Sequence, residues 1–511
     1  IALTANDYTE KLGISAFLFS KPPMLNEMRF YFFNVTNEDE MIYEGAPVRV
    51  VQVGPYTFME SEEKRYLQYR KNDDQVYYQN YKKWIYHNEL SCDSCSYNDI
   101  VSIPNAPQIG SSAGMYDPLY GVTPTARTII AIGLLLLGEY PINSPTVGDL
   151  LFDGYNDALL SAAHSPIVTI LSNMFNEGVN IIPIPVPDMH TMAYFNSYNN
   201  SRDEEYWIHT GKEDINRIGE IVTWANQTML PETWWTTEQA RMINGTDTGS
   251  FAPPGLNEDS ILPMFHSYLC RSFNAVYQGQ REVFGIPSYT YAVQDDEWDT
   301  TLEKNKGFRY RNVEKIKYYN DWPMCPKWNS SNCKASPNDP IDCYSDLCND
   351  CCNKGQLGDT YAIPPGLFPL ACYPGRLQPS PFAVLWSPPH FLYSPDQVIN
   401  SVKGINPDRS KHQPMVYDHE PYSGMITQVA YRAQIAIPMF ANPIVIQNSH
   451  LPSSIAPIFY EDSTAILTDF AYSFYRLGFM FFPVFIMWFS ISLIIFSVIL
   501  AILILTLCVK R

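Results

Sequence analysis

Two short stretches carry residue types that could do hydrolytic chemistry. The first, DTGS from Asp247, matches the motif of aspartic proteases, in which two aspartates share one proton because like charges at close range cannot both ionise. A single chain of this size needs the motif twice, and it occurs here once. Gly245 and Thr246 precede it and indicate a turn, and Asn244 begins an N-glycosylation acceptor. We therefore interpret the stretch as a glycosylated turn.

The second stretch, GSSAG at 110–114, fits the G-x-S-x-G nucleophile elbow with Ser112 as the nucleophile. The elbow requires a strand directly before the serine and a helix directly after it. Prolines interrupt the approach here, and the next helical pattern begins well downstream. Asp188 and His390 are candidate partners of the serine. A lipid serine hydrolase that uses Ser112 stays an alternative, but we assign no catalytic residue and predict no enzyme.

Histidine and cysteine spacing gives little support for a metal site. His164 and His266 form no H-E-x-x-H pattern, so we interpret them as structural or surface residues with satisfied hydrogen bonds. The C-x-x-C pairs at 92–95 and 348–351 could hold zinc, but outside the cytosol such pairs form disulfides. We predict no metal and no other cofactor.

The cysteines divide at a long apolar segment near the C-terminus. Cys508 lies within that segment and is either an inert membrane thiol or a site of S-acylation. The other ten cysteines precede it, and an even number in a lumenal region predicts a disulfide framework whose pairing the spacing leaves open. These ten are Cys92, Cys95, Cys270, Cys325, Cys333, Cys343, Cys348, Cys351, Cys352 and Cys372.

The apolar segment itself predicts a transmembrane helix at 477–509, because it contains no charged residue and exceeds the about 20 residues that a bilayer requires. Lys510 and Arg511 follow and predict a cytoplasmic stub at 510–511. Residues 1–475 are then expected to lie outside the cell or in a lumen. The five glycosylation acceptors agree, since all precede the span: Asn34, Asn199, Asn226, Asn244 and Asn329.

Composition favours a domain that is rich in β-strands and does not bind nucleic acid. Among the 511 residues, 46% are hydrophobic, which suffices for a real core, and the abundance of tyrosine and proline favours strands and turns. The net charge of −19 repels phosphate backbones, so nucleic-acid binding is excluded as a function class.

Strand patterns run along most of the chain. The first, 28–35 and 48–59, are rich in β-branched and aromatic residues, and we expect Gly54-Pro55 to stop the second. Helical spacing marks 109–176, where the apolar run 128–138 is too short to cross a bilayer and fits a buried or partner-facing helix. Residues 325–372 form a cysteine-rich loop region. The fold class is α+β, mainly β.

Several stretches, in this order along the chain, resemble the class B scavenger receptor family, whose members include the fatty-acid translocase, the high-density-lipoprotein receptor and the lysosomal integral membrane proteins. The similarity covers nearly the whole chain. The matching stretches are GPYT at 54–57, DLLFDGYNDALLS at 149–161, RMINGTDTGSFAPP at 241–254, LCRSFNAVY at 269–277, GIPSYTY at 285–291, PHFLYSPD at 389–396, GINP at 404–407 and DHEPYSG at 418–424.

The resemblance implies an irregular antiparallel β-barrel ectodomain with an apical helical bundle, an apolar tunnel towards the membrane and a second span before Ile1. It also implies a disulfide between Cys270 and Cys372. The pairing of the remaining lumenal cysteines stays open. These are Cys92, Cys95, Cys325, Cys333, Cys343, Cys348, Cys351 and Cys352.

The implied function is a membrane-anchored receptor that binds lipids (fatty acid, sterol or phospholipid) or lipoprotein particles and transfers lipid to the bilayer. The alternative is a lysosomal or endosomal trafficking receptor that binds a protein at the apex helices. Between Lys83 and Lys212 there is no lysine, so the basic apex of several family members is absent. No acidic dileucine signal follows the span, so we expect the cell membrane, with the lysosomal or endosomal membrane as the alternative location.

Overall fold

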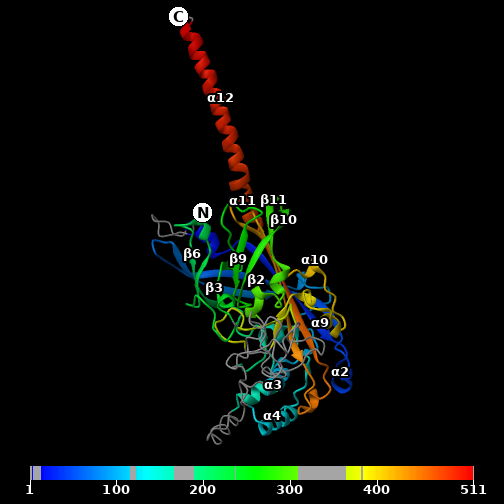
Figure 1. The fold of residues 1–511 in the computed structure, drawn as a ribbon. Helices are drawn as coiled ribbons and strands as arrows, with labels where there is room; N and C mark the ends of the chain where they lie inside the picture. Colours follow the sequence, from blue (N-terminus) through cyan, green and yellow to red (C-terminus); the bar gives the residue numbers. More distant parts are fainter. Residues whose placement is uncertain are drawn as a thin grey trace, which may run out of the picture.

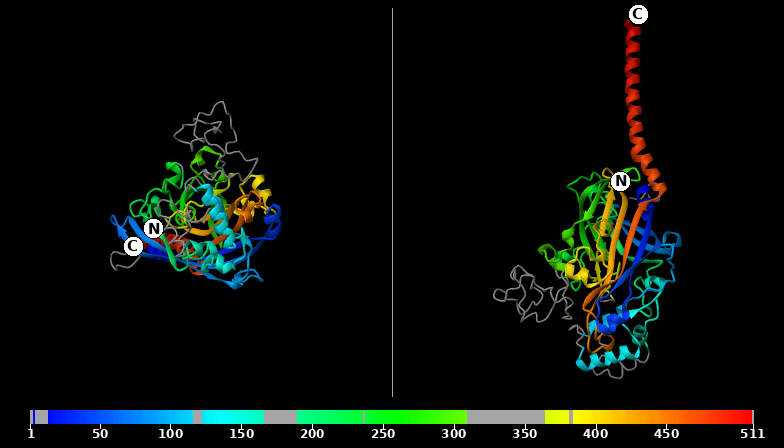
Figure 2. Two further views of the ribbon diagram at one scale, coloured as in Figure 1. Left: turned by 90° about the horizontal axis from the view of Figure 1, so that it is seen from below. Right: turned by 90° about the vertical axis from the view of Figure 1, so that its right-hand side faces the viewer.

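The computed structural model describes residue 3 and residues 13–115, 122–165, 189–235, 237–308, 364–380 and 384–509. Its body is elongated, with long strands running along the long axis (Figure 2). One long helix, α12 (Phe482–Val509), projects from one end, and the helices α3 (Ala106–Gly114) and α4 (Pro124–Leu136) lie at the opposite end (Figure 1). We call the first end the membrane end and the second the apex.

A single 14-stranded sheet forms the body. Its neighbours pair antiparallel except β8 with β9. The two ends of the strand order, β7 and β8, approach each other, since the amide of Ile221 donates to the carbonyl of Gly245 at 2.8 Å, and the sheet is therefore a nearly closed, barrel-like structure. This confirms the mainly-β prediction. The strands in spatial order are β7 (Ile221–Trp224), β6 (Ser201–His209), β3 (Gln75–Tyr86), β2 (Val50–Arg70), β1 (Met24–Val35), β16 (Ser454–Leu467), β15 (Ile426–Met439), β14 (Met415–His419), β11 (Ile286–Val293), β10 (Arg271–Val283), β9 (Ile261–His266) and β8 (Thr246–Asp247), with β12 (Phe368–Pro369) and β13 (Leu385–Ser387) attached to β15.

The prediction that Gly54-Pro55 ends a strand is wrong, because β2 continues through both residues to Arg70. The pairing of β2 with β1 shifts register between Phe30 and Phe32, which is the signature of a bulge that accommodates the extra chain. Gly54 has a φ of +127°, and a Cβ there would lie 2.6 Å from the carbonyl oxygen of Phe30. The glycine therefore permits the bulge rather than stopping the strand.

The apolar run at 128–138 forms most of α4, as expected. Its first turn is capped by the hydroxyl of Thr123, which accepts a hydrogen bond from the amide of Ala126. Ile129, Ile132 and Leu136 on this helix are exposed to solvent. The helix is thus not buried, and of the two alternatives only the partner-facing one stays open.

Three predicted regions extend beyond the described residues. The helical insertion at 109–176 is described as far as residue 165 and contains α3, α4, the π-helical turn η3 (Asp149–Asp153) and α5 (Ala158–Ala163). A helical bundle at the apex stays a prediction. The cysteine-rich region 325–372 lies outside the described residues up to residue 363, and so does the stub 510–511.

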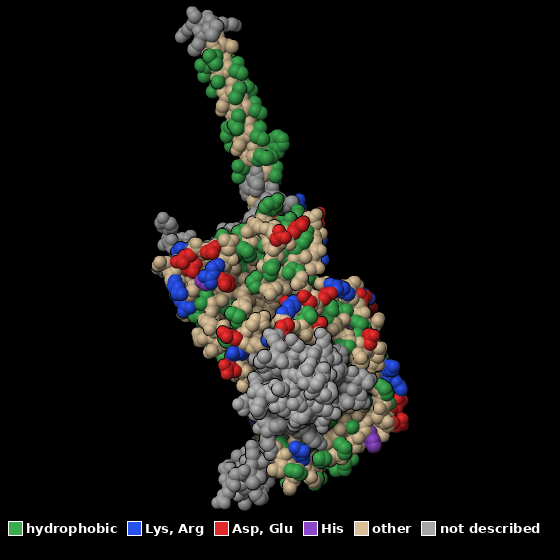
Figure 3. Space-filling view, viewed as in Figure 1, with side chains coloured by type: hydrophobic (Ala, Val, Ile, Leu, Met, Phe, Trp, Pro, Cys, Tyr) green, Lys and Arg blue, Asp and Glu red, His purple; other side chains and the backbone are tan. Residues whose placement is uncertain are grey.

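The C-terminal segment leaves the barrel through α11 (Asp469–Tyr475) and the π-helical turn η11 (Arg476–Phe481) before α12 begins. Within α12, Val484–Thr506 is long and apolar enough to cross a membrane, and none of it is buried against the protein. Hydrophobic side chains cover its surface (Figure 3). A water-exposed helix of this composition would be costly, so it is a candidate membrane span at the predicted position.

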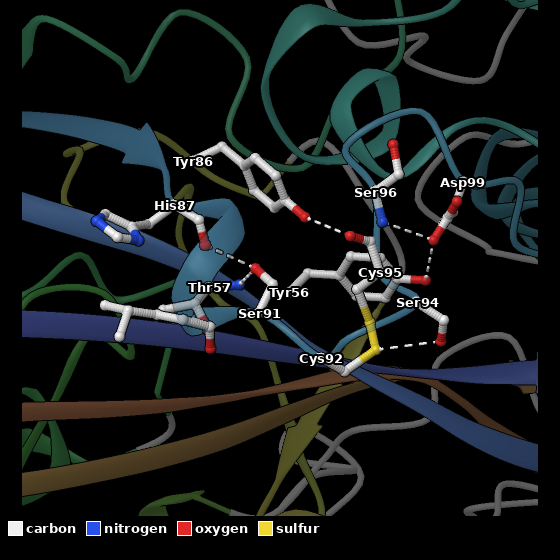
Figure 4. The surroundings of a disulfide bond; sticks show 11 residues. Tyr56, Thr57, Tyr86, His87, Ser91, Cys92, Ser94, Cys95, Ser96 and Asp99 are labelled. Carbon is white, nitrogen blue, oxygen red and sulfur yellow. Dashed lines mark hydrogen bonds between the residues drawn. A yellow bond between two sulfur atoms is a disulfide. The ribbon is translucent and has the colours of Figure 1, made fainter.

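Two disulfides are described. Cys92 and Cys95 pair with a Cα separation of 5.0 Å and are therefore not free to bind zinc. The amide of Cys92 donates to Pro55 of β2 at 3.0 Å, and the hydroxyl of Tyr86 at the end of β3 donates to the carbonyl of Cys95 at 3.1 Å (Figure 4). This small loop therefore joins the end of β3 to an interior position of β2. Cys270 pairs with Cys372 across 102 residues, with a Cα separation of 6.1 Å.

Candidate functional site

A cavity of about 690 Å³ occupies the membrane end of the barrel-like sheet. Its size falls within the roughly 300–1,000 Å³ typical of small-molecule pockets. The walls come from alternate residues of β1, β2, β3, β15 and β16, and from the segments that flank the sheet. We call this space the lower cavity.

Strand alternation explains the lining of the lower cavity, because every second side chain of a strand points to the same face. On β1 the inward residues are Met24, Asn26 and Met28. On β16, which pairs with β1, the inward residues are Glu461, Ser463, Ala465 and Leu467. Small and polar side chains at these positions leave space that aromatic side chains would fill.

The outer rim of the lower cavity is apolar and adjoins the candidate span. Pro22 and Pro23 precede β1, and Phe470, Ala471 and Tyr475 come from α11, the helix that leads into the span. The cavity thus borders the segment that would enter the bilayer.

The inner wall of the lower cavity carries charged residues. Glu60 accepts hydrogen bonds from Asn26 Nδ2 and Trp84 Nε1, both at 2.8 Å. Lys82 Nζ lies 3.4 Å from Glu60 Oε1, and its ammonium also stands over the ring of Tyr268. Burial alone would lower the pKa of Lys82, but nearby carboxylates, led by Glu60, hold that pKa well above its usual value. Lys82 is therefore a fixed cation.

A second ion pair joins Lys64 to Glu62 on the same strand face. Lys64 is buried, and its ammonium stands over the rings of Phe19 and Tyr78. Burial alone would raise the pKa of Glu62, but Lys64 and then Lys82 lower it below its usual value. Both cations of the cavity wall thus have their own carboxylate.

Two aspartates lie behind this wall. Asp247 is buried and accepts a hydrogen bond from the hydroxyl of Tyr78 at 3.1 Å. Burial raises the pKa of Asp247 and, further, that of Asp203, which is also buried. Burial therefore favours the protonated form of both carboxyls.

The sequence interpretation of the DTGS stretch was incomplete. Gly245 and Gly249 adopt the positive φ values of a turn, +81° and +72°, as expected. However, Asp247 points into the barrel interior, and Thr248 and Ser250 line the lower cavity. The prediction of a glycosylated turn did not include this buried carboxyl, which lies beside the charged wall of the cavity.

The geometry of a nucleophile elbow is absent at Ser112. This serine lies inside α3, is fully buried, and its hydroxyl accepts a hydrogen bond from Asn442 Nδ2 at 2.9 Å. The ring of His390 contacts other groups, Gln52 Oε1 at 2.8 Å and the amide of Asn406. Asp188 lies outside the described residues.

The prediction that His266 is a satisfied structural residue is wrong, because its Nδ1 has no hydrogen-bond partner among the described residues. His266 is buried, lines the lower cavity and stacks on Tyr431 with ring centroids 4.4 Å apart. Burial and then the charge of Lys82 lower its pKa to about 3, so the ring is neutral. His164 contacts the carbonyl of Leu160 at 2.8 Å.

Glycosylation stays a prediction. The side chains of Asn199, Asn226 and Asn244 are exposed, as an acceptor requires. Asn34 is half-buried, and its Oδ1 accepts a hydrogen bond from the amide of Ser102 at 2.8 Å. Asn329 lies outside the described residues.

The described residues form a mainly-β protein with a barrel-like sheet, a cavity at one end and a candidate membrane span that leaves from that end. The model of the CD36 family matches residues 9–508, and the chain belongs to this family. This agrees with the resemblance to class B scavenger receptors, and the family's members are membrane receptors.

The chain is 43% identical to an uncharacterized protein of Caenorhabditis elegans, over 94% of this chain and 86% of the relative. It is 26% identical to lysosome membrane protein 2 of Mus musculus, over 88% of this chain and 76% of the relative. It is 24% identical to scavenger receptor class B member 1 of Rattus norvegicus, over 89% of this chain and 73% of the relative.

Proposed function

We propose that this protein is a receptor that binds lipids or lipid-bearing particles and passes lipid through the lower cavity to the bilayer. The observation that carries the proposal is the position of the cavity. Phe470, Ala471 and Tyr475 line its rim and belong to the helix that leads into the candidate span. A lipid in this cavity would therefore leave it at the membrane.

The energetics of lipid transfer favour an apolar passage beside the bilayer. Each CH₂ group that enters water costs about 0.8 kcal/mol, so a long acyl chain meets a desorption barrier on the order of 10 kcal/mol. An apolar passage next to the bilayer removes much of this barrier without a chemical step. Lipid then flows along its concentration gradient.

Substitution of Ala465 tests the proposal. Ala465 lines the lower cavity on β16, and Ala465→Phe would fill space that a lipid needs. The adjacent Thr464 lies on the opposite face of the same strand, so Thr464→Phe is a matched control. Uptake of a fluorescent sterol and a fluorescent fatty acid is measured in transfected cells at equal surface expression.

We expect cells with the wild-type protein or Thr464→Phe to take up more lipid than untransfected cells. Cells with Ala465→Phe are expected to lose most of that gain. Equal uptake by all transfected and untransfected cells would contradict lipid transfer. Full uptake by Ala465→Phe would contradict the role of the lower cavity.

The exposed face of α4 favours the second candidate, a trafficking receptor with a protein ligand at the apex. Ile129, Ile132 and Leu136 lie at helical spacing and are 55%, 51% and 81% exposed. If this function holds, Ile132→Asp lowers the amount of at least one soluble protein in the lysosomes of expressing cells, while Ala465→Phe does not. Unchanged lysosomal proteomes in both variants would contradict it.

A further inference from the structure

The charged groups on the wall of the lower cavity do not balance. Among the described residues that line it, the carboxylates are Glu60, Glu62 and Glu461, and the cations are Lys64 and Lys82. The ion pairs Glu60–Lys82 and Glu62–Lys64 use both cations. Within the described part of the chain, the carboxyl of Glu461 is therefore left without an ion-pair partner.

Glu461 also lies among polar groups that have no hydrogen-bond partner within the described part of the chain. Neither its carboxyl nor the hydroxyls of Tyr268 and Tyr431, which line the same cavity, make a described hydrogen bond. The Nδ1 of His266, whose residue is 95% buried, is unpartnered in the same wall. Buried polar atoms are normally satisfied, and His266 Nδ1 departs from that rule, among the described residues, in the wall that also holds Glu461.

The charges decide which headgroup fits. A carboxylate headgroup would meet a wall in which both lysines already have a carboxylate partner and in which Glu461 is a further acidic group. An ammonium headgroup would instead form the ion pair that Glu461 lacks. Tyr431 and Tyr268 line the same cavity and could accept hydrogen bonds from the ammonium group.

We propose that the inner wall of the lower cavity is a headgroup site for a lipid that carries a protonated amine, with Glu461 as its counter-ion and the alkyl chain directed towards the apolar rim. This inference rests on the proposed function and names the class of lipid. The proposal also fixes the orientation of the lipid. Its alkyl chain contacts the rim formed by Pro22, Pro23 and Phe470, and its amine headgroup contacts the inner wall.

Binding of the amine at this site is expected to release a proton from Glu461. Burial, and then the charge of Glu60, raise the pKa of Glu461 to about 8, while Lys82 opposes that rise. An ammonium group binds the ionised carboxylate, so the amine lipid should bind more weakly as the pH falls below 8. Burial lowers the pKa of His266 to about 3 and raises the pKa of Tyr268 and of Tyr431 above its usual value, so none of the three should gain or lose a proton between pH 6 and 8. Nearby carboxylates hold the pKa of Lys82 above its usual value, and Lys64 and Lys82 hold that of Glu62 below it. The other charged residues nearby are Glu60 and Lys64 in the wall and Asp462, which pairs with Arg432 on the other side of the strand.

Three lipids with the same chain of 18 carbons test the proposal: octadecylamine, octadecanol and stearic acid. Their affinities for the full-length protein in lipid nanodiscs are measured by competition with a fluorescent lipid. We expect the amine to bind at least about tenfold more tightly than the alcohol at pH 8, with the acid weakest. Between pH 8 and 6 the amine should lose up to about tenfold per unit, and the alcohol should not change.

Two variants assign the effect. Glu461→Gln removes the charge at constant shape and should abolish the advantage of the amine over the alcohol. Asp462→Asn removes an equal charge from the next residue, which faces Arg432 on the other side of the strand, and should preserve that advantage. Unchanged binding of octadecanol to Glu461→Gln shows that the variant is folded.

Equal binding of the three lipids, or an equal loss of all three in Glu461→Gln, would overturn the headgroup assignment and leave lipid binding intact. Binding of none of them would overturn the proposed function, and the headgroup site with it.

Discussion

The interior of the barrel-like sheet differs between its two ends, although the same strands build both. Towards the apex, inward positions carry Phe30, Phe58 and Phe459, which pack edge to face with ring centroids 5.7 Å apart and are buried. We call this the packed half. Towards the membrane end, the same strands carry the residues of the lower cavity, such as Asn26 and Glu461.

The boundary between the two halves is sharp in the sequence. On β2 the inward series runs from Tyr56 and Phe58 to Glu60 and Glu62. On β16 it runs from Phe459 to Glu461 within two residues. Side-chain volume and charge, rather than backbone path, therefore decide which half is a core and which is a binding space. Because side chains alternate between the two faces of a strand, one strand can line a packed core at one end and a cavity at the other without a change in backbone geometry.

The largest difference between the halves should appear on truncation. Phe459→Ala removes a buried ring from the packed half and should lower the free energy of unfolding by about 3–5 kcal/mol. Val429→Ala shortens a side chain that already borders the lower cavity and should cost about 1 kcal/mol. Thermal unfolding of the full-length protein measures both. Similar losses would show that the membrane end is packed as well as the apex.

The next largest loss of stability is expected on removal of a charged residue from the inner wall of the lower cavity. Glu60→Ala leaves Lys82 without its ion-pair partner and leaves Trp84 Nε1 without its acceptor, so we expect a loss of about 3 kcal/mol. The double variant Glu60→Ala/Lys82→Met removes the unpaired charge and should recover most of that loss. If the double variant is less stable than Glu60→Ala, the two residues do not act as an ion pair.

The pH dependence of stability should show a smaller effect, which comes from Glu461 at the membrane end. Because the pKa of Glu461 is raised to about 8 in the folded protein, the folded state holds this proton more tightly than the unfolded chain does. The stability that this proton contributes is fully present below the unfolded pKa, near 4.5, and is lost as the pH rises towards 8. Unfolding midpoints between pH 5 and 8 should fall less in Glu461→Gln than in the wild type. Identical slopes would contradict a shifted pKa.

The smallest effect is expected outside both halves. Leu136 on α4 is 81% exposed, so Leu136→Ser should change the free energy of unfolding by less than about 0.5 kcal/mol. A loss above about 1 kcal/mol would show that this face is covered in the folded protein. The same thermal unfolding assay measures it.

Local patterns predicted much of the fold. The strands β1 and β3 and the helix α4 follow from residue type and spacing, and the candidate span follows from hydropathy alone. The path of β2 through Gly54 did not, because a glycine-proline pair has the same appearance in a turn and in a bulge until the partner strand is known.

The site was harder to predict than the fold. Glu60, Glu62 and Lys64 alternate after the inward Phe58, which was the available signal, but such a pattern also describes a strand face in contact with water. Only long-range pairing brings Lys82, Glu461 and His266 to the same space, and no local spacing contains that information. The burial of Asp247 within the predicted turn was not foreseen for the same reason.

The most direct test of the account is an electron cryomicroscopy map of the full-length protein in nanodiscs that contain octadecylamine. The account predicts elongated density in the lower cavity, with one end beside Glu461 and the other at the rim near Phe470, and no lipid density among Phe30, Phe58 and Phe459. A lower cavity filled by rearranged side chains, or lipid density confined to the outside of the barrel, would contradict it.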